Sequence, residues 1–167
     1  LYSLPESVTS LNITMGYDSK SNPVQIFIQK WFKMHINALN RNKKSYTFYH
    51  KDVVEVLSHP LIESITKSYR VVEKINKNNL TFFSDQNLQN LQGNKTELFN
   101  IITEKWSDDV IEITDRLIKI LLIIKLNLNE KEDKLSLTFL YAIFKAINQL
   151  KNYALKFDSI SSPEQLF

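Results

Sequence analysis

The sequence contains no cysteine, two glycines and four prolines among its 167 residues. Without cysteine the chain cannot form a disulfide framework, a thiol nucleophile or a cysteine-based zinc cluster. Two glycines are too few for a glycine-rich loop of the kind that holds a phosphate group. The scarcity of glycine and proline together also argues against a turn-rich β-sandwich. The composition therefore excludes several common classes of site and of fold.

The chain also lacks a strong charge of either sign and a long uninterrupted apolar run. Its formal net charge of +3 and pI near 8.9 are mildly basic, well short of a dedicated nucleic-acid binder. The most apolar stretch, 117–128, has nine apolar residues in twelve but is interrupted by Lys119 and Lys125. A buried helix is therefore favoured over a membrane-spanning one. The first ten residues show no signal-peptide pattern and no initiator methionine, so we expect a mature or trimmed form.

The stretch 96–129 is predicted to form one long helix around which the other elements are arranged. Its apolar residues recur at steps of three and four, which is the spacing of one helix face. They are Phe99, Ile102, Trp106, Val110, Ile113, Leu117, Leu121, Ile124 and Leu128. The acidic residues of the opposite face are Glu104, Asp108, Glu112 and Asp115. At roughly 1.5–3 kcal/mol for each fully buried large side chain, the apolar face is predicted to be the main source of stability.

Three further helices are predicted from the same spacing. Asn22 and Pro23 are a favoured N-cap and first helical residue, and the apolar pattern continues from there to about residue 40. A second pattern, 54–75, is interrupted by Pro60, where we expect the helix to kink or break, with the kink preferred. The last helix is predicted over about 133–157.

The connections between these helices are expected to lack regular structure for most of their length. Residues 46–49 are aromatic, but no second strand pattern exists to pair with them, so no strand is predicted. The linker 77–94 is too apolar for a free loop and is expected to fold back, with one helical turn after Ser84. Asn94 or Thr96 is predicted to cap the long helix.

Together the elements predict an all-α fold with one domain. We expect a single four-helix bundle of long antiparallel helices over 22–157, with the second helix kinked or broken near Pro60. Residues 1–21 are predicted to form an extended N-terminal arm, and residues 158–167 a C-terminal tail. The length is sufficient to bury a sizeable core.

No catalytic, cofactor or metal site is predicted. A di-iron bundle needs Glu-x-x-His on two helices, whereas the nearest pair here, Glu55 and His59, is four residues apart. The three histidines form no local ligand pair, and His35 lies on an apolar helix face, where a core position is expected. Nothing marks a nucleophile elbow or an oxyanion nest. We therefore expect a protein that is not an enzyme and that needs no cofactor.

The best candidate for a local binding site combines Arg41, Lys43, Lys44 and Tyr46. Basic residues interleaved with aromatic ones are the components of single-stranded nucleic-acid sites. The cluster is short and has no fold signature around it, so a solvated loop between helices is the favoured interpretation. Nucleic acid is not a partner that we favour.

Contact with a membrane surface or with a host or partner protein is the stronger functional hypothesis. The predicted helices carry lysines on their polar faces, at Lys30, Lys33, Lys145, Lys151 and Lys156. Such helices either bury their apolar faces against one another or open onto lipid. A closed bundle is preferred, although polar positions such as Ser68 in the predicted core favour a bundle that can rearrange.

A chain without cysteine, rich in lysine, asparagine and isoleucine, with four long helices over 22–157, resembles the small bundle-type proteins that malaria (Plasmodium) sporozoites need for cell traversal. The resemblance rests on layout and composition, and no site residue is carried over. It implies a secreted parasite protein that acts on membranes or partner proteins, without catalysis, during passage through host cells. The alternative is an intracellular helical scaffold or adaptor domain of a larger protein, with weak nucleic-acid contact through residues 41–44.

Overall fold

Three long helices dominate the computed structural model, which is almost entirely helical and confirms the all-α prediction. They are α1 (Pro23–Arg41), α7 (Val110–Asn127) and α8 (Lys134–Lys156). The residues that the structure describes are 22–41, 45–93, 96–129 and 134–156. The predicted arm and tail lie outside them. Within them, five short helices and a two-stranded sheet separate α1 from α7, so a single four-helix bundle is not confirmed.

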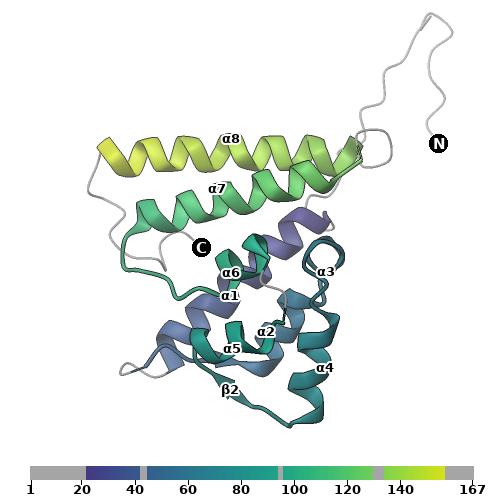
Figure 1. Ribbon diagram of the computed structural model, residues 1–167. Coiled ribbons are helices and arrows are strands. Elements are labelled where there is room, and N and C mark those ends of the chain that lie inside the picture. The colour runs from purple at the N-terminus through teal and green to yellow at the C-terminus, as the bar shows by residue number, and fades with distance from the viewer. Residues whose placement is uncertain (1–21, 42–44, 94–95, 130–133, 157–167) are drawn as a thin grey trace, which may run out of the picture.

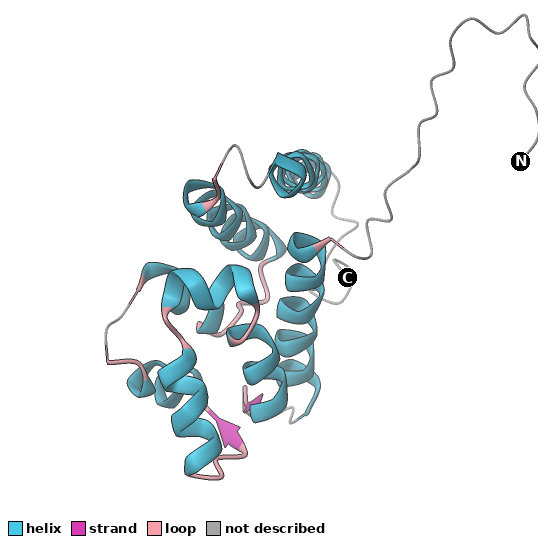
Figure 2. Ribbon diagram, turned by 90° about the vertical axis from the view of Figure 1, so that its right-hand side faces the viewer, coloured by secondary structure: helices cyan, strands magenta, loops and turns pink. Residues whose placement is uncertain are grey.

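The helices are arranged in layers, with α8 outermost (Figures 1 and 2). α8 runs along α7, and its closest contacts are with that helix, followed by a smaller contact with α1. On the other side of α7 lies the body formed by α1 and the short helices. The connection between α7 and α8 falls in residues 130–133, outside the described part. The pair forms the predicted antiparallel hairpin of helices.

The start of α1 follows the sequence prediction. Asn22 caps the helix, because its Oδ1 accepts a hydrogen bond from the backbone N–H of Val24 at 2.9 Å. Pro23 occupies the first helical position, where its missing N–H costs nothing. The helix continues to Arg41, one residue beyond the predicted end.

The predicted second helix is broken at Pro60, and it is broken again further along. α2 (His50–Leu57) ends before the proline, α3 (Pro60–Thr66) begins on it, and α4 (Tyr69–Lys77) follows a second break. Lys67 produces that second break, since its φ of 54° is left-handed and cannot continue a helix. The preferred prediction of one kinked helix is therefore wrong, because the chain breaks both before Pro60 and at Lys67.

The absence of strands was predicted wrongly. β1 (Phe48–Tyr49) pairs antiparallel with β2 (Phe82–Phe83), with Phe48 opposite Phe83 and Tyr49 opposite Phe82. The backbone N–H of His50 extends the pairing by donating to the carbonyl of Thr81. Two-residue strands carry almost no periodicity, so only the folding back of the chain brings them together.

The linker between the sheet and the long helix contains the predicted helical turn. It is α5 (Asp85–Leu91), which Ser84 caps by accepting a hydrogen bond from the backbone N–H of Asn87 at 3.2 Å. The next helix, α6 (Glu97–Thr103), is capped by Thr96, one of the two predicted caps. Asn94, the other, lies outside the described residues.

The prediction of one continuous helix over 96–129 is wrong, because the chain breaks between α6 and α7. Asp109 caps α7, its Oδ1 accepting from the backbone N–H of Ile111 at 2.8 Å. The Arg116 guanidinium donates to the carbonyl oxygens of Lys105 at 2.9 Å and Glu104 at 3.4 Å. These backbone acceptors, which lie in the break, therefore have hydrogen-bond partners. The predicted burial is nevertheless confirmed, since eight of the nine apolar residues are buried and Leu128 is half-buried.

The break exists because Trp106 turns into the core between α1 and α6. Its ring stacks on the His35 imidazole, with centroids 4.5 Å apart and planes 2° from parallel. Trp31 meets the same indole edge to face at 5.2 Å. Trp31 Nε1 and His35 Nε2 both donate to the carbonyl oxygen of Ile102, at 3.0 and 2.9 Å. They therefore supply hydrogen-bond donors to a carbonyl group in the last turn of α6, which has no partner within the helix.

Candidate contact surface

α8 is poorly covered by the rest of the protein. Only Leu140 and Ile147 are buried among its 23 residues. Six of the eight exposed large hydrophobic side chains among the described residues belong to α7 or α8. These are Leu122, Leu126, Leu135, Tyr141, Tyr153 and Leu155. Scattered exposed leucines are ordinary, whereas their concentration on one pair of helices makes this pair the candidate contact surface.

Two of these exposed side chains, Leu122 and Tyr141, line a groove between α7 and α8. The groove has a volume of about 370 Å³ and is lined mainly by apolar side chains. From α7 come Leu122 and Lys125, and from α8 come Leu137, Leu140, Tyr141 and Phe144. Leu126 and Tyr141 are the most exposed of the six, at 84% and 68%. We call α8 together with the α7 face around this groove the contact layer.

The contact layer is also the basic part of the molecule. The segments 117–129 and 134–156 contain six lysines and no aspartate or glutamate. Including residues 130–133, the stretch has seven lysines and three acidic residues, a formal net charge of +4 against +3 for the whole chain. Lys151 pairs with Asp115 of α7 and ties the two helices together, whereas Lys134, Lys145 and Lys156 are exposed. The layer therefore combines apolar side chains with unneutralised positive charge.

Two of the sequence-predicted binding residues, Arg41 and Tyr46, lie in the described part of the chain, and they contact different neighbours. The Arg41 guanidinium covers the Tyr49 ring, 4.4 Å from its centroid, and lies 3.9 Å from Asp52. Tyr46 is half-buried and faces the core. Lys43 and Lys44 lie outside the described residues. Arg41 and Tyr46 therefore have separate local partners in the fold.

Tyr46 belongs to a buried network with His35. The carbonyl of Ile102 can only accept, so His35 Nε2 carries the proton and Nδ1 accepts from the Tyr46 hydroxyl. Burial lowers the pKa of His35 to about 3, because a charged imidazole would lose its hydration there. Burial also raises the pKa of Tyr46. Both groups are neutral at pH 7, as expected for satisfied core residues.

Three of the five acidic residues of 104–115 form ion pairs. Glu104 and Glu112 both pair with Arg116, and Asp115 pairs with Lys151. Among the described residues no group of three His, Asp or Glu side chains is placed to hold a metal ion. In the same part of the chain, no helix is both long and apolar enough to cross a membrane.

The comparisons with known proteins do not place the chain in a family. No family model, no curated protein and no solved structure matches it. The resemblance to the sporozoite traversal proteins therefore stays a prediction. The sequence analysis named the lysines of the last helix but did not predict the groove. The signal that could have drawn attention to this helix was the absence of any acidic residue over 134–156.

Proposed function

We propose that the protein acts without catalysis, by laying the contact layer of α7 and α8 on an anionic lipid surface. The observation that carries the proposal is the coincidence of exposed apolar side chains and lysines on one layer that contains no carboxylate in its described helical segments 117–129 and 134–156. A basic amphipathic helix of this kind is typical of proteins that bind in the plane of a membrane interface.

Both components of the layer would contribute to binding. Inserting Leu126 or Tyr141 below the headgroups removes apolar surface from water, at roughly 25 cal/mol per Å². Each lysine near an anionic leaflet adds about 1 kcal/mol, an attraction that salt weakens. Lys125 lines the groove and Lys145 is exposed on α8, so both charge and apolar surface are available on the same layer.

The layer can bind lipid while the fold stays closed. α8 already leaves Tyr141 and Leu155 exposed, at 68% and 63%, and its buried contacts reach α7 through other residues. The rearranging bundle considered from the sequence is therefore unnecessary for a first contact. Opening of α8 away from α7 would be a later step.

The setting that we propose is the one the resemblance implies, a secreted parasite protein that meets host-cell membranes. The runner-up, an intracellular scaffold or adaptor domain, would use the same groove for a partner protein. The two differ in one measurable property, since a scaffold has no reason to distinguish anionic from neutral vesicles.

Co-sedimentation with vesicles tests the proposal. We expect binding to vesicles that contain phosphatidylserine, little binding to pure phosphatidylcholine, and release by high salt. The double variant Leu126→Asp, Tyr141→Asp should lose binding by more than tenfold, because two carboxylates would enter the interface. Its matched control is Phe82→Asp, which changes another exposed aromatic residue, on β2, outside the layer.

Equal binding to both lipids would contradict selectivity for an anionic surface, and no binding to either would contradict lipid contact. Equal losses in the α7–α8 variant and in Phe82→Asp would contradict the choice of surface. Circular dichroism in the near-UV and far-UV must show both variants folded before their binding is compared.

A further inference from the structure

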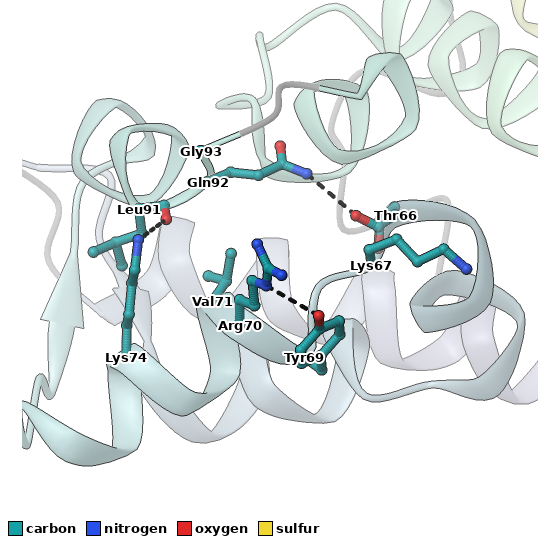
Figure 3. Close-up of a pocket in the computed structure, with 9 residues that line it drawn as sticks. All are labelled: Thr66, Lys67, Tyr69, Arg70, Val71, Lys74, Leu91, Gln92 and Gly93. Atoms are coloured by element: carbon teal, nitrogen blue, oxygen red, sulfur yellow. Dashed lines mark hydrogen bonds between the residues drawn. The ribbon is translucent and has the colours of Figure 1, made fainter.

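A second concave site lies away from the contact layer, between the start of α4 and the turn after α5. Its volume is about 490 Å³. Three of the side chains that line it are cationic, Lys67, Arg70 and Lys74, and none is acidic. Figure 3 shows Arg70 and Lys74 rising from α4 towards residues 91–93, with Lys67 at the opposite end of the cavity. In volume the cavity suits a small molecule.

The three cations have no carboxylate partner in the part of the chain that the structure describes. Among the described residues no ion pair includes any of them, and Glu73, the acidic residue of α4, pairs with Lys77. Arg70 and Lys74 are four residues apart on one helix face, where like charges repel. A bound anion would remove that repulsion.

The local fold holds the cations in place. The left-handed backbone of Lys67 ends α3, and Ser68 then donates its hydroxyl to the carbonyl of Leu57 at 2.7 Å, fixing the junction against α2. At the other end, Lys74 Nζ donates to the carbonyl of Leu91 at 2.9 Å. The backbone at Lys67 and the position of the Lys74 ammonium are therefore set before any ligand arrives, which limits the ordering cost of binding.

Of the three cations, Arg70 is best placed to bind an oxyanion. Its Nε donates to the Tyr69 hydroxyl at 3.0 Å, and no hydrogen bond within the described residues involves its two terminal nitrogens. A guanidinium held in this way presents a fork that matches two oxygens of a phosphate group. Lys67 and Lys74 add point charges on either side.

The rest of the lining suits an organic body attached to the anion. Val71, Leu91 and the Tyr69 ring supply apolar contact. The Gln92 amide is largely buried, and its Nε2 donates to the carbonyl of Thr66 at 3.5 Å, which closes the cavity between α3 and α5. We infer that this cavity binds a small organic molecule that carries a phosphate or equivalent oxyanion.

Titration with phenyl phosphate, followed by calorimetry and by amide and Arg Nε–H NMR shifts, tests the inference. We expect saturable binding with shifts at residues 67–74 and 91–93, weaker binding of inorganic phosphate and none of benzyl alcohol. Arg70→Gln should weaken binding about tenfold or more, since a charge-assisted pair is lost. Arg70→Lys should recover part of the loss. Lys51→Gln, which removes an exposed charge from α2 outside the cavity, should change affinity less than twofold.

No saturable binding of phenyl phosphate, or equal losses in Arg70→Gln and Lys51→Gln, would overturn the inference. Vesicles containing phosphatidic acid separate a soluble ligand from a lipid headgroup. If Arg70→Gln reduces vesicle binding while phenyl phosphate binds neither protein, the site belongs to a headgroup and the inference fails. The contact-layer variant should bind phenyl phosphate as the unmodified chain does, so this test and the test of the proposed function fail independently.

Discussion

α1 and α8 are both long amphipathic helices, but the rest of the protein buries far more of α1 than of α8. Seven of the 19 residues of α1 are buried, against two of the 23 residues of α8. α1 contacts several elements through aromatic side chains, whereas α8 lies mainly on α7. The comparison shows that an apolar face predicts a helix but not how much of the face the chain itself will cover. The uncovered face of α8 is where we place function.

The largest expected difference between the two helices concerns stability. Trp31→Ala in α1 should lower the free energy of unfolding by about 3–5 kcal/mol, because it leaves a cavity and removes the hydrogen bond to Ile102. Tyr141→Ala in α8 should change it by less than about 0.5 kcal/mol. Urea unfolding followed by circular dichroism measures both. Similar losses in the two variants would remove the contrast on which the account rests.

Acid should loosen the α1 side of the molecule first, because α8 contains no histidine. Burial lowers the pKa of His35 to about 3 and that of His59 to about 4, the latter with a smaller effect of Lys30. Near pH 6.5 the unfolded chain gains protons that the folded chain does not. The stabilisation is therefore complete above pH 6.5 and is lost as the pH falls towards 4 and then 3.

The His35 share of this acid effect can be isolated. Between pH 7 and pH 5, protonation of His35 in the unfolded chain should lower the free energy of unfolding by about 2 kcal/mol. His35→Gln should be less stable at pH 7 but should show a flatter dependence on pH, in urea midpoints taken at each pH. An unchanged slope in His35→Gln would contradict the assignment of the effect to this residue.

The smallest effect concerns the ion pair between α7 and α8. Asp115 and Lys151 are partly exposed, so Asp115→Asn should cost only about 0.2–1 kcal/mol. A double-mutant cycle with Lys151→Gln, measured in urea, gives the coupling between the two side chains. A coupling above about 2 kcal/mol would mean that this pair, rather than apolar contact with α7, holds α8 in place.

Local signals in the sequence predicted the all-α class and several element boundaries. Asn22, Pro60, Ser84 and Thr96 each act through their own backbone neighbourhood, and each predicted an element boundary that the structure contains. The apolar spacing along 96–129 predicted burial even where it failed to predict a continuous helix.

The features that the sequence did not predict depend on contacts between distant residues. The break before α7 exists because Trp106 stacks on His35, 71 residues earlier in the chain. The pairing of Phe48 with Phe83 likewise joins residues that are 35 positions apart in the chain. The groove of the contact layer depends on how α8 docks on α7, which periodicity does not specify.

Hydrogen exchange with and without vesicles that contain phosphatidylserine tests the central claim most directly. If the outer face of α8 lies on the lipid while the fold stays closed, amides of residues 134–156 should exchange more slowly with vesicles present, and those of α1 should be unchanged. Unchanged exchange in α8 despite co-sedimentation, or faster exchange in α1, would contradict the account. The first result would place the lipid contact elsewhere, and the second would mean that the body of the protein opens.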